Sequence, residues 1–181
     1  EGSWISPSYL VAEIIIIPLA AWLTTIFSPR RFAVTISAIF VIASLLCSMA
    51  WSLESMIVFR ALQGLAGGAL IPFAFTLILI KLPPSSRPKG MALFAITATF
   101  APSIGPTIGG WLTEHFGWEY IFYINIVPGI LMAAGLMYGL DKSQPRWDLL
   151  RQGDYMGIVT MAVGLGCLQV FLEEGHRKDW L

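Results

Sequence analysis

Charged residues are scarce in this sequence: Asp, Glu, Lys and Arg make up only 12% of its 181 residues, and the formal net charge is zero. In a soluble domain about a quarter of the residues are charged, so the composition argues against a water-soluble fold. Basic patches interleaved with aromatic side chains are missing, so we expect no nucleic-acid partner. Hydrophobic residues make up 56% of the chain. This composition indicates an integral membrane protein whose surroundings are a lipid bilayer.

Cysteine and histidine are also scarce, with two of each. Cys47 and Cys167 each lie alone in an apolar run, without the spacing of zinc ligands or of a disulfide framework. His115 and His176 lie in polar connections, without a second ligand nearby in the sequence. We therefore expect no metal site and no cofactor. The lack of a nucleophile–base pair or a phosphate-binding loop argues against an enzyme.

Long apolar runs make up most of the chain, at about 8–27, 33–53, 56–80, 90–113, 119–140 and 155–172. Each has roughly the twenty residues that an α-helix needs to cross the hydrocarbon. The runs are continuously apolar and do not alternate, which argues against a β-barrel. The sequence thus predicts an all-α, polytopic membrane helix bundle with six transmembrane helices.

Basic residues are concentrated in every second connection. They are Arg30 and Arg31, then Lys81, Arg87 and Lys89, and then Lys142, Arg146 and Arg151. Because positively charged connections stay in the cytoplasm, we predict that these three lie inside and that the first span enters from outside.

Two ionisable residues, Glu13 and Arg60, lie within predicted spans at what we estimate to be similar depth. Arginine at the centre of a span costs about 2.5–3.5 kcal/mol, so its presence indicates a function. Arg60 shares a helix face with Gly64 and Gly68, a pair of small residues four apart that is typical of helix packing. We therefore expect Arg60 to point inward and not to snorkel to the headgroups. Three roles stay open for Glu13: a proton-binding site, an ion-pair partner of Arg60, or a rim residue facing water.

The segment 101–110, with the sequence APSIGPTIGG, puts two prolines and three glycines inside a predicted span. Each proline removes a backbone donor, and no water in the hydrocarbon can bond to the freed carbonyls. Gly105 and Gly109 form a second small pair four residues apart. We therefore predict a kinked helix whose glycine face is covered closely by another helix.

Two motifs resemble the major facilitator superfamily. They are Arg60-Ala61-Leu62-Gln63-Gly64-Leu65-Ala66-Gly67-Gly68 and Gly105-Pro106-x-x-Gly109-Gly110. The chain looks most like the fourteen-helix drug:proton antiporters of the EmrB/QacA type. Phe122-Tyr123-Ile124-Asn125-Ile126-Val127-Pro128-Gly129 and Asp154-Tyr155-Met156-Gly157 are similar to the starts of the family's sixth and seventh helices.

The resemblance implies a domain organisation in which the six spans correspond to family helices two to seven. Residues 1–140 would form a partial N-terminal transmembrane bundle without the first family helix. Residues 141–153 would be a cytoplasmic connection, and residues 154–181 would form an additional transmembrane helix and an outer tail.

The resemblance also implies a function: a fragment of a proton-coupled multidrug efflux transporter in the cytoplasmic, or inner, membrane. Such an antiporter exports hydrophobic or cationic small molecules by alternating access. It has a periplasmic adaptor protein as a partner if it comes from a Gram-negative bacterium. Proton coupling would involve Arg60, Glu13 and Gln63, and the packing surface of the antiporter motif would be Gly105, Pro106, Gly109 and Gly110. The alternatives are an importer of a metabolite and an inactive or truncated membrane protein with a structural role.

The segment of this chain that corresponds to the family's loop between its second and third helices departs most from the family pattern. That loop usually reads Gly-x-Leu-Ala-Asp-Arg-x-Gly-Arg-Arg, and here the segment 21–31 keeps Leu23, Arg30 and Arg31. Thr25 replaces the aspartate, and both glycines are gone. Since Thr25 cannot make the aspartate's charge interaction, we expect the cytoplasmic gate around Arg30 and Arg31 to be weaker or to be held in another way.

Overall fold

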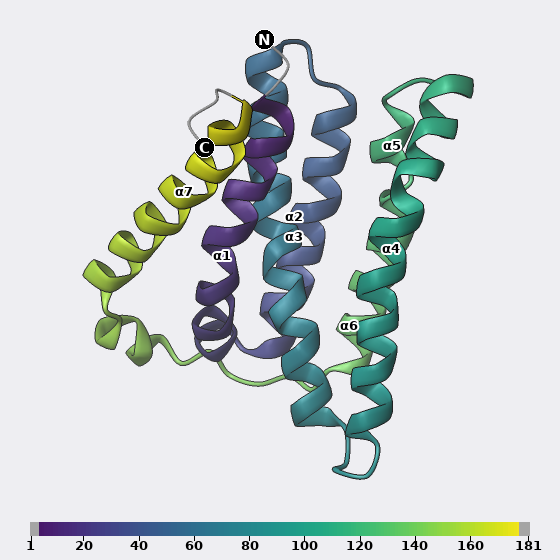
Figure 1. Cartoon of the computed structure of the whole chain (residues 1–181). Helices are drawn as coiled ribbons and strands as arrows, with labels where there is room; N and C mark the ends of the chain where they lie inside the picture. The colour runs from purple at the N-terminus through teal and green to yellow at the C-terminus, as the bar shows by residue number, and fades with distance from the viewer. Residues whose placement is uncertain (1–3, 178–181) are drawn as a thin grey trace.

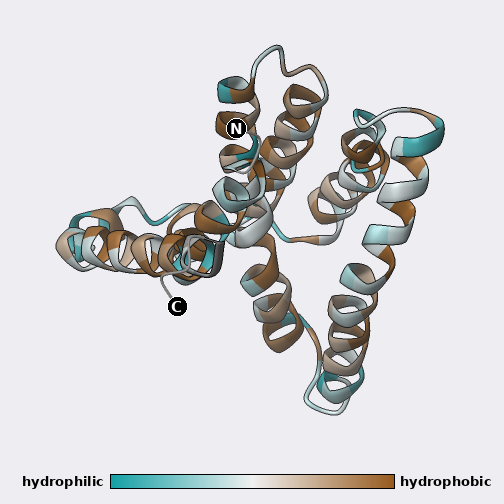
Figure 2. Ribbon diagram, turned by 45° about the horizontal axis from the view of Figure 1, so that its top comes forward, coloured by the Kyte–Doolittle hydropathy of each residue, from teal (hydrophilic) through white to brown (hydrophobic). Residues whose placement is uncertain are grey.

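The computed structural model describes residues 4–177, which form helices joined by short connections (Figure 1). The helices are α1 (Ile5–Phe27), α2 (Pro29–Ser48), α3 (Leu53–Lys81), α4 (Arg87–His115), α5 (Tyr120–Tyr123), α6 (Ile126–Gly139) and α7 (Tyr155–Arg177), with a 3-10 turn η2 (Trp147–Gln152) before α7. Within the described residues, six segments are long and apolar enough to cross a membrane, with α5 and α6 counted as one. Hydrophobic residues dominate the helices, and hydrophilic ones gather mainly in the connections (Figure 2). The predicted all-α bundle of six spans is confirmed.

The boundary between the second and third spans lies earlier than predicted. α2 ends at Ser48 and α3 begins at Leu53, whereas the apolar runs predict an end at 53 and a start at 56. Ser52 explains the early start, because its hydroxyl accepts a hydrogen bond from the backbone N–H of Ser55 at 3.1 Å, and the Ser55 hydroxyl accepts one from the N–H of Ser52. This reciprocal cap satisfies donors that a helix start leaves unpaired.

The predicted span 119–140 is interrupted between α5 and α6, at Ile124 and Asn125. Pro128 gives the physical reason, because the carbonyl of Ile124 would bond to the N–H four residues later in a continuous helix. Proline has no such N–H. The helix resumes at Ile126, and the N–H of Gly129 bonds to the carbonyl of Asn125 at 3.0 Å.

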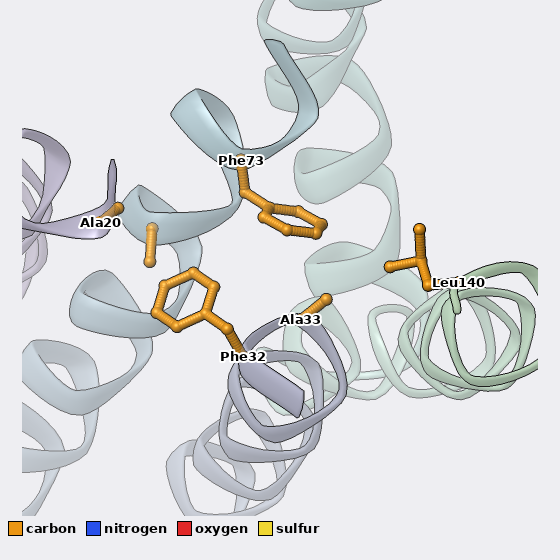
Figure 3. Packing of buried hydrophobic residues seen from close by; sticks show 6 residues of the cluster. Ala20, Phe32, Ala33, Phe73 and Leu140 are labelled. Atoms are coloured by element: carbon orange, nitrogen blue, oxygen red, sulfur yellow. The ribbon is translucent and has the colours of Figure 1, made fainter. Parts of the chain in front are cut away.

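Helices α1, α2 and α3 form the centre of the molecule, and α6 packs against α2 (Figure 1). A cluster of buried side chains joins them near the connection between α1 and α2: Ala20, Phe32, Ala33, Ala69, Phe73 and Leu140. In Figure 3 the rings of Phe32 and Phe73 lie near each other, with centroids 5.9 Å apart, and Leu140 approaches from the end of α6. This cluster fixes the end of the bundle where the predicted cytoplasmic connections meet.

Helices α4 and α7 lie at the periphery, on opposite sides of this centre (Figure 1). None of the residues of α4 is buried. α7 packs against α1, where the rings of Trp22 and Tyr155 meet edge to face. α7 continues to Arg177, beyond the predicted end at 172, and residues 178–181 of the predicted outer tail lie outside the described range.

Candidate functional site around Arg60

Glycines on α3 allow α1 to approach so closely that the two backbones touch. A Cβ atom at Gly64 would overlap the backbone carbonyl of Tyr9, and one at Gly68 would lie 2.7 Å from the carbonyl oxygen of Glu13. The predicted use of Gly64 and Gly68 as a packing pair is therefore confirmed. Small residues are what permit such an approach in a membrane bundle.

Arg60 lies at the outer end of this contact and is held by α3 itself. Its Nη1 donates a hydrogen bond to Oε1 of Gln63 at 2.9 Å, and Nε2 of Gln63 donates one to the hydroxyl of Ser44 on α2 at 2.8 Å. Gln63 is only 2% exposed, so its bond to Ser44 is buried and its bond to Arg60 is partly buried. Cys47 lies beside it, with Sγ 4.0 Å from Oε1 of Gln63. The network ties the direction of the guanidinium group to the packing of α2 on α3.

Two aromatic rings from other helices face the guanidinium group. The Cζ atom of Arg60 lies 5.2 Å from the centroid of the Tyr9 ring on α1 and 5.3 Å from that of Phe122 on α5. Cations at this distance from an aromatic face are attracted by its electrons, most strongly where water is excluded. Arg60 thus points into the space between α1, α3 and α5.

The guanidinium group keeps an unused donor. The Nε atom of Arg60 is buried and has no hydrogen-bond partner among residues 4–177. Over the same residues, the structure records one ion pair, between Lys81 and Asp141, and so no carboxylate neutralises Arg60. A buried donor without a partner costs about 1–3 kcal/mol, which makes this group a favourable place for an acceptor or an anion to bind.

Glu13 is not at the depth of Arg60, contrary to our estimate from the sequence. Its backbone lies beside Gly68, which is eight residues further along α3 than Arg60. At 1.5 Å per residue this offset is about 12 Å along the helix. The estimate counted residues from the start of each apolar run, whereas the depth depends on how α1 and α3 are aligned. The described residues give no support to an ion pair between Glu13 and Arg60. Its roles as a proton-binding site or a water-facing residue stay predictions.

The glycine face of α4 has no covering helix within the described residues. A Cβ atom built at Gly105, Gly109 or Gly110 would meet nothing within 4 Å. Gly105 and Gly109 line an open apolar groove of about 670 Å³ between α4 and the α5 region, together with Ile104, Ile108, Ile121 and Asn125. α4 continues as one helix through Pro102 and Pro106. The predicted close packing of this face stays a prediction about residues outside the described bundle.

Arg30 and Arg31 lie in the first turn of α2, at the opposite end of the bundle from Arg60. They line a small polar pocket with Ser28 and with Lys142, Ser143 and Gln144 of the connection after α6. The hydroxyl of Thr25 donates to the carbonyl of Ala21 within α1 at 3.0 Å. Thr25 is thus bonded to its own helix, whereas the family pattern has an aspartate at this position.

The family model described as Major Facilitator Superfamily matches residues 1–154. The chain belongs to the major facilitator superfamily. Membership agrees with the six membrane-crossing segments and identifies the bundle as part of a superfamily N-terminal bundle. The protein is accordingly a multi-pass integral protein of the cytoplasmic membrane, of a transporter family and not an enzyme family.

Superfamily relatives match over the full chain. The chain is 40% identical over 181 residues to the colistin resistance protein EmrB of Acinetobacter baumannii and 37% identical over 180 residues to the fatty acid resistance protein FarB of Neisseria gonorrhoeae. It is also 33% identical over 180 residues to the multidrug export protein EmrB of Escherichia coli K12. The matches cover 99–100% of this chain, and the chain spans about a third (35%) of each of these relatives. The resemblance to EmrB-type drug transporters is confirmed.

Three residues that shape the Arg60 site are not among those predicted from the sequence: Ser44, Tyr9 and Phe122. Ser44 left a signal, because Ser37, Ser44 and Ser48 recur at helical spacing inside an apolar run and therefore share one face. The structure buries all three. Tyr9 and Phe122 left none, since aromatic residues near the end of a span usually anchor it to the membrane interface.

Proposed function

We propose that the protein is a proton-coupled efflux transporter that exports hydrophobic or cationic small molecules by alternating access. The names of the relatives concern resistance to colistin and fatty acids and the export of multiple drugs. These names cover chemically varied compounds, which fits an exporter of hydrophobic or cationic small molecules.

The half-buried arginine inside the bundle is the observation that carries the proposal. The guanidinium group of Arg60 lies inside the bundle, bonded to Gln63 and flanked by two rings, with a buried Nε donor unpaired among residues 4–177. A static anchor gains nothing from such a group, because its insertion costs free energy. A transporter gains a fixed positive charge that favours the ionised form of any carboxylate brought near it. We infer that Arg60 promotes proton release from an intramembrane carboxylate when the bundle changes conformation.

Everted membrane vesicles that contain the full-length protein test this role. Export by proton exchange predicts that added drug accumulates inside them and dissipates a preformed proton gradient. Arg60→Ala should abolish the drug-dependent proton movement, and Arg60→Lys should restore part of it because the charge remains. Val58→Ala, at an exposed position on the same helix, is the matched control and should behave like the wild type.

Two results would contradict the proposal. Normal coupling in correctly inserted Arg60→Ala protein would rule out the role of the charge. Release of a preloaded metabolite from the everted vesicles, with protons moving in the same direction and without accumulation of drug, would favour an importer. Immunoblots of the vesicle membranes confirm that each variant is inserted at an equal level.

A further inference from the structure

A polar pocket of about 370 Å³ lies at the predicted cytoplasmic end of the bundle, away from Arg60. Two segments far apart in the sequence form it: Ser28, Arg30 and Arg31 from the start of α2, and Lys142, Ser143 and Gln144 from the connection after α6. Its charged lining is therefore entirely positive. Asp141, the adjacent carboxylate, is engaged by Lys81 outside the pocket.

The start of α2 adds backbone donors to this lining. Pro29 occupies the first position of the helix, and no side chain caps the first turn. The N-terminus of a helix carries partial positive charge and unpaired N–H groups, which favour anions. A twenty-residue helix that has Arg30 and Arg31 in its first turn, with Lys142 lining the same pocket, is thus suited to bind a negative group.

Ser28 independently indicates a ligand in the same pocket. The residue is 2% exposed and lines the pocket, yet its hydroxyl has no hydrogen-bond partner within residues 4–177. Buried hydroxyl groups are nearly always bonded, and leaving one unpaired costs free energy. A phosphate oxygen in the pocket would accept a hydrogen bond from this hydroxyl.

An apolar groove continues from the polar pocket and shares Arg30 and Arg31 with it. This groove, of about 410 Å³, is lined otherwise mostly by Phe27, Val34, Met137, Pro145 and Trp147. Phe27 and Trp147 meet edge to face with centroids 5.4 Å apart, and the N–H of Arg146 bonds to the carbonyl of Ile26 at 2.9 Å. These contacts hold the connection against the end of α1, so the groove and the pocket form one amphipathic site.

We propose that this site binds an anionic phospholipid of the cytoplasmic leaflet, with its phosphate in the pocket and an acyl chain along the groove. The phosphate is held by Arg30, Arg31 and Lys142, by the first turn of α2 and by the Ser28 hydroxyl. Free phosphate would use the pocket alone, and the adjoining apolar groove is what favours a lipid. Bound lipid would join α2 to the connection that leads to α7.

Native mass spectrometry of the full-length protein in detergent tests the proposal by titration with dioleoyl phosphatidylglycerol. Dioleoyl phosphatidylcholine, which has the same chains and no net charge, is the lipid control. Removal of the Lys142 charge by Lys142→Gln should weaken phosphatidylglycerol binding roughly fivefold, the effect typical of one basic residue at an anionic membrane surface. The matched control is Lys89→Gln, an exposed lysine at the same predicted side of the membrane and outside the pocket, which should retain wild-type binding.

Ser28→Gly is a second variant that separates binding from folding. It removes the hydroxyl, and glycine readily adopts the positive φ of this residue. It should also weaken binding, without loss of thermal stability. Equal binding by Lys142→Gln and Lys89→Gln would overturn the proposal, and so would equal affinity for the two lipids. Full displacement of the lipid by millimolar inorganic phosphate would overturn the lipid assignment in favour of a free-anion site.

Discussion

Replacing Gly64 with alanine should destabilise the bundle, because α1 leaves no room for a methyl group there. The new Cβ atom would overlap the Tyr9 carbonyl oxygen and lie 3.0 Å from both the carbonyl carbon and the Cα of that residue. Favourable contacts between carbon atoms require about 3.5–4.0 Å, so α1 would have to move by roughly half an ångström or more. These atoms belong to the backbone and cannot rotate away.

The cost of this shift follows from other overpacked sites. Adding a methyl group to a closely packed contact costs about 1–3 kcal/mol, and we expect about 2 kcal/mol for Gly64→Ala. Gly67→Ala should cost less, since its Cβ would meet the hydroxyl end of the Tyr9 side chain at 2.7 Å, and that side chain can move. Gly135→Ala on α6, where nothing lies within 4 Å, is the matched control.

The measurement is the unfolding of the purified full-length variants in mixed micelles with increasing SDS, followed by circular dichroism. The expected order of stability is Gly135→Ala, then Gly67→Ala, then Gly64→Ala as the least stable. If Gly64→Ala proved as stable as Gly135→Ala, the close backbone contact between α1 and α3 would be refuted.

The same unfolding assay checks three further predictions. Gln63→Leu should cost about 2–3 kcal/mol, because it leaves two buried or half-buried partners without their hydrogen bonds; a neutral result would contradict the buried network. Ser28→Gly should raise stability by about 1 kcal/mol, since Ser28 has φ 70° and ψ 145°, a region that is nearly limited to glycine; a loss of stability would contradict this. The hydrogen bond and charge of Lys81 hold the pKa of Asp141 below its ordinary 3.8, so the ion pair adds stability above that pH and loses it as the pH falls through the lowered value. Wild type should therefore exceed Asp141→Asn in stability at pH 7, and the difference should shrink progressively as the pH is lowered below 3.8.

The backbone conformation of Ser28 bears on the place where this chain lacks a glycine of the family's loop pattern. Counted from Ala21, the second glycine of the pattern falls at Ser28, the one described non-glycine residue with positive φ. A positive φ is the conformation that favours glycine, so the backbone at Ser28 suits the residue type that the family pattern has there.

The sequence by itself determined the number of spans and their approximate positions. Each apolar run must become a helix in the bilayer, because only intrahelical hydrogen bonds satisfy its backbone there. The predicted helix boundaries are wrong where a local hydrogen bond determines the boundary. The side-chain cap at Ser52 starts α3 early, and the missing N–H of Pro128 separates α5 from α6. The motifs around Arg60 and Gly105 also identified the family without any coordinates.

Only the tertiary structure decided which residues meet. Helices can slide and rotate against one another without any change in their apolar pattern, so the sequence does not specify their relative alignment. For this reason the sequence could not specify the two-turn offset between Glu13 and Arg60 or the hydrogen bond from Gln63 on α3 to Ser44 on α2. The pocket between the start of α2 and Lys142 likewise depends on how the connection after α6 folds back onto α1. Local hydrogen bonding and hydrophobicity determine which segments are helical, and long-range packing determines which residues meet in the sites between the helices.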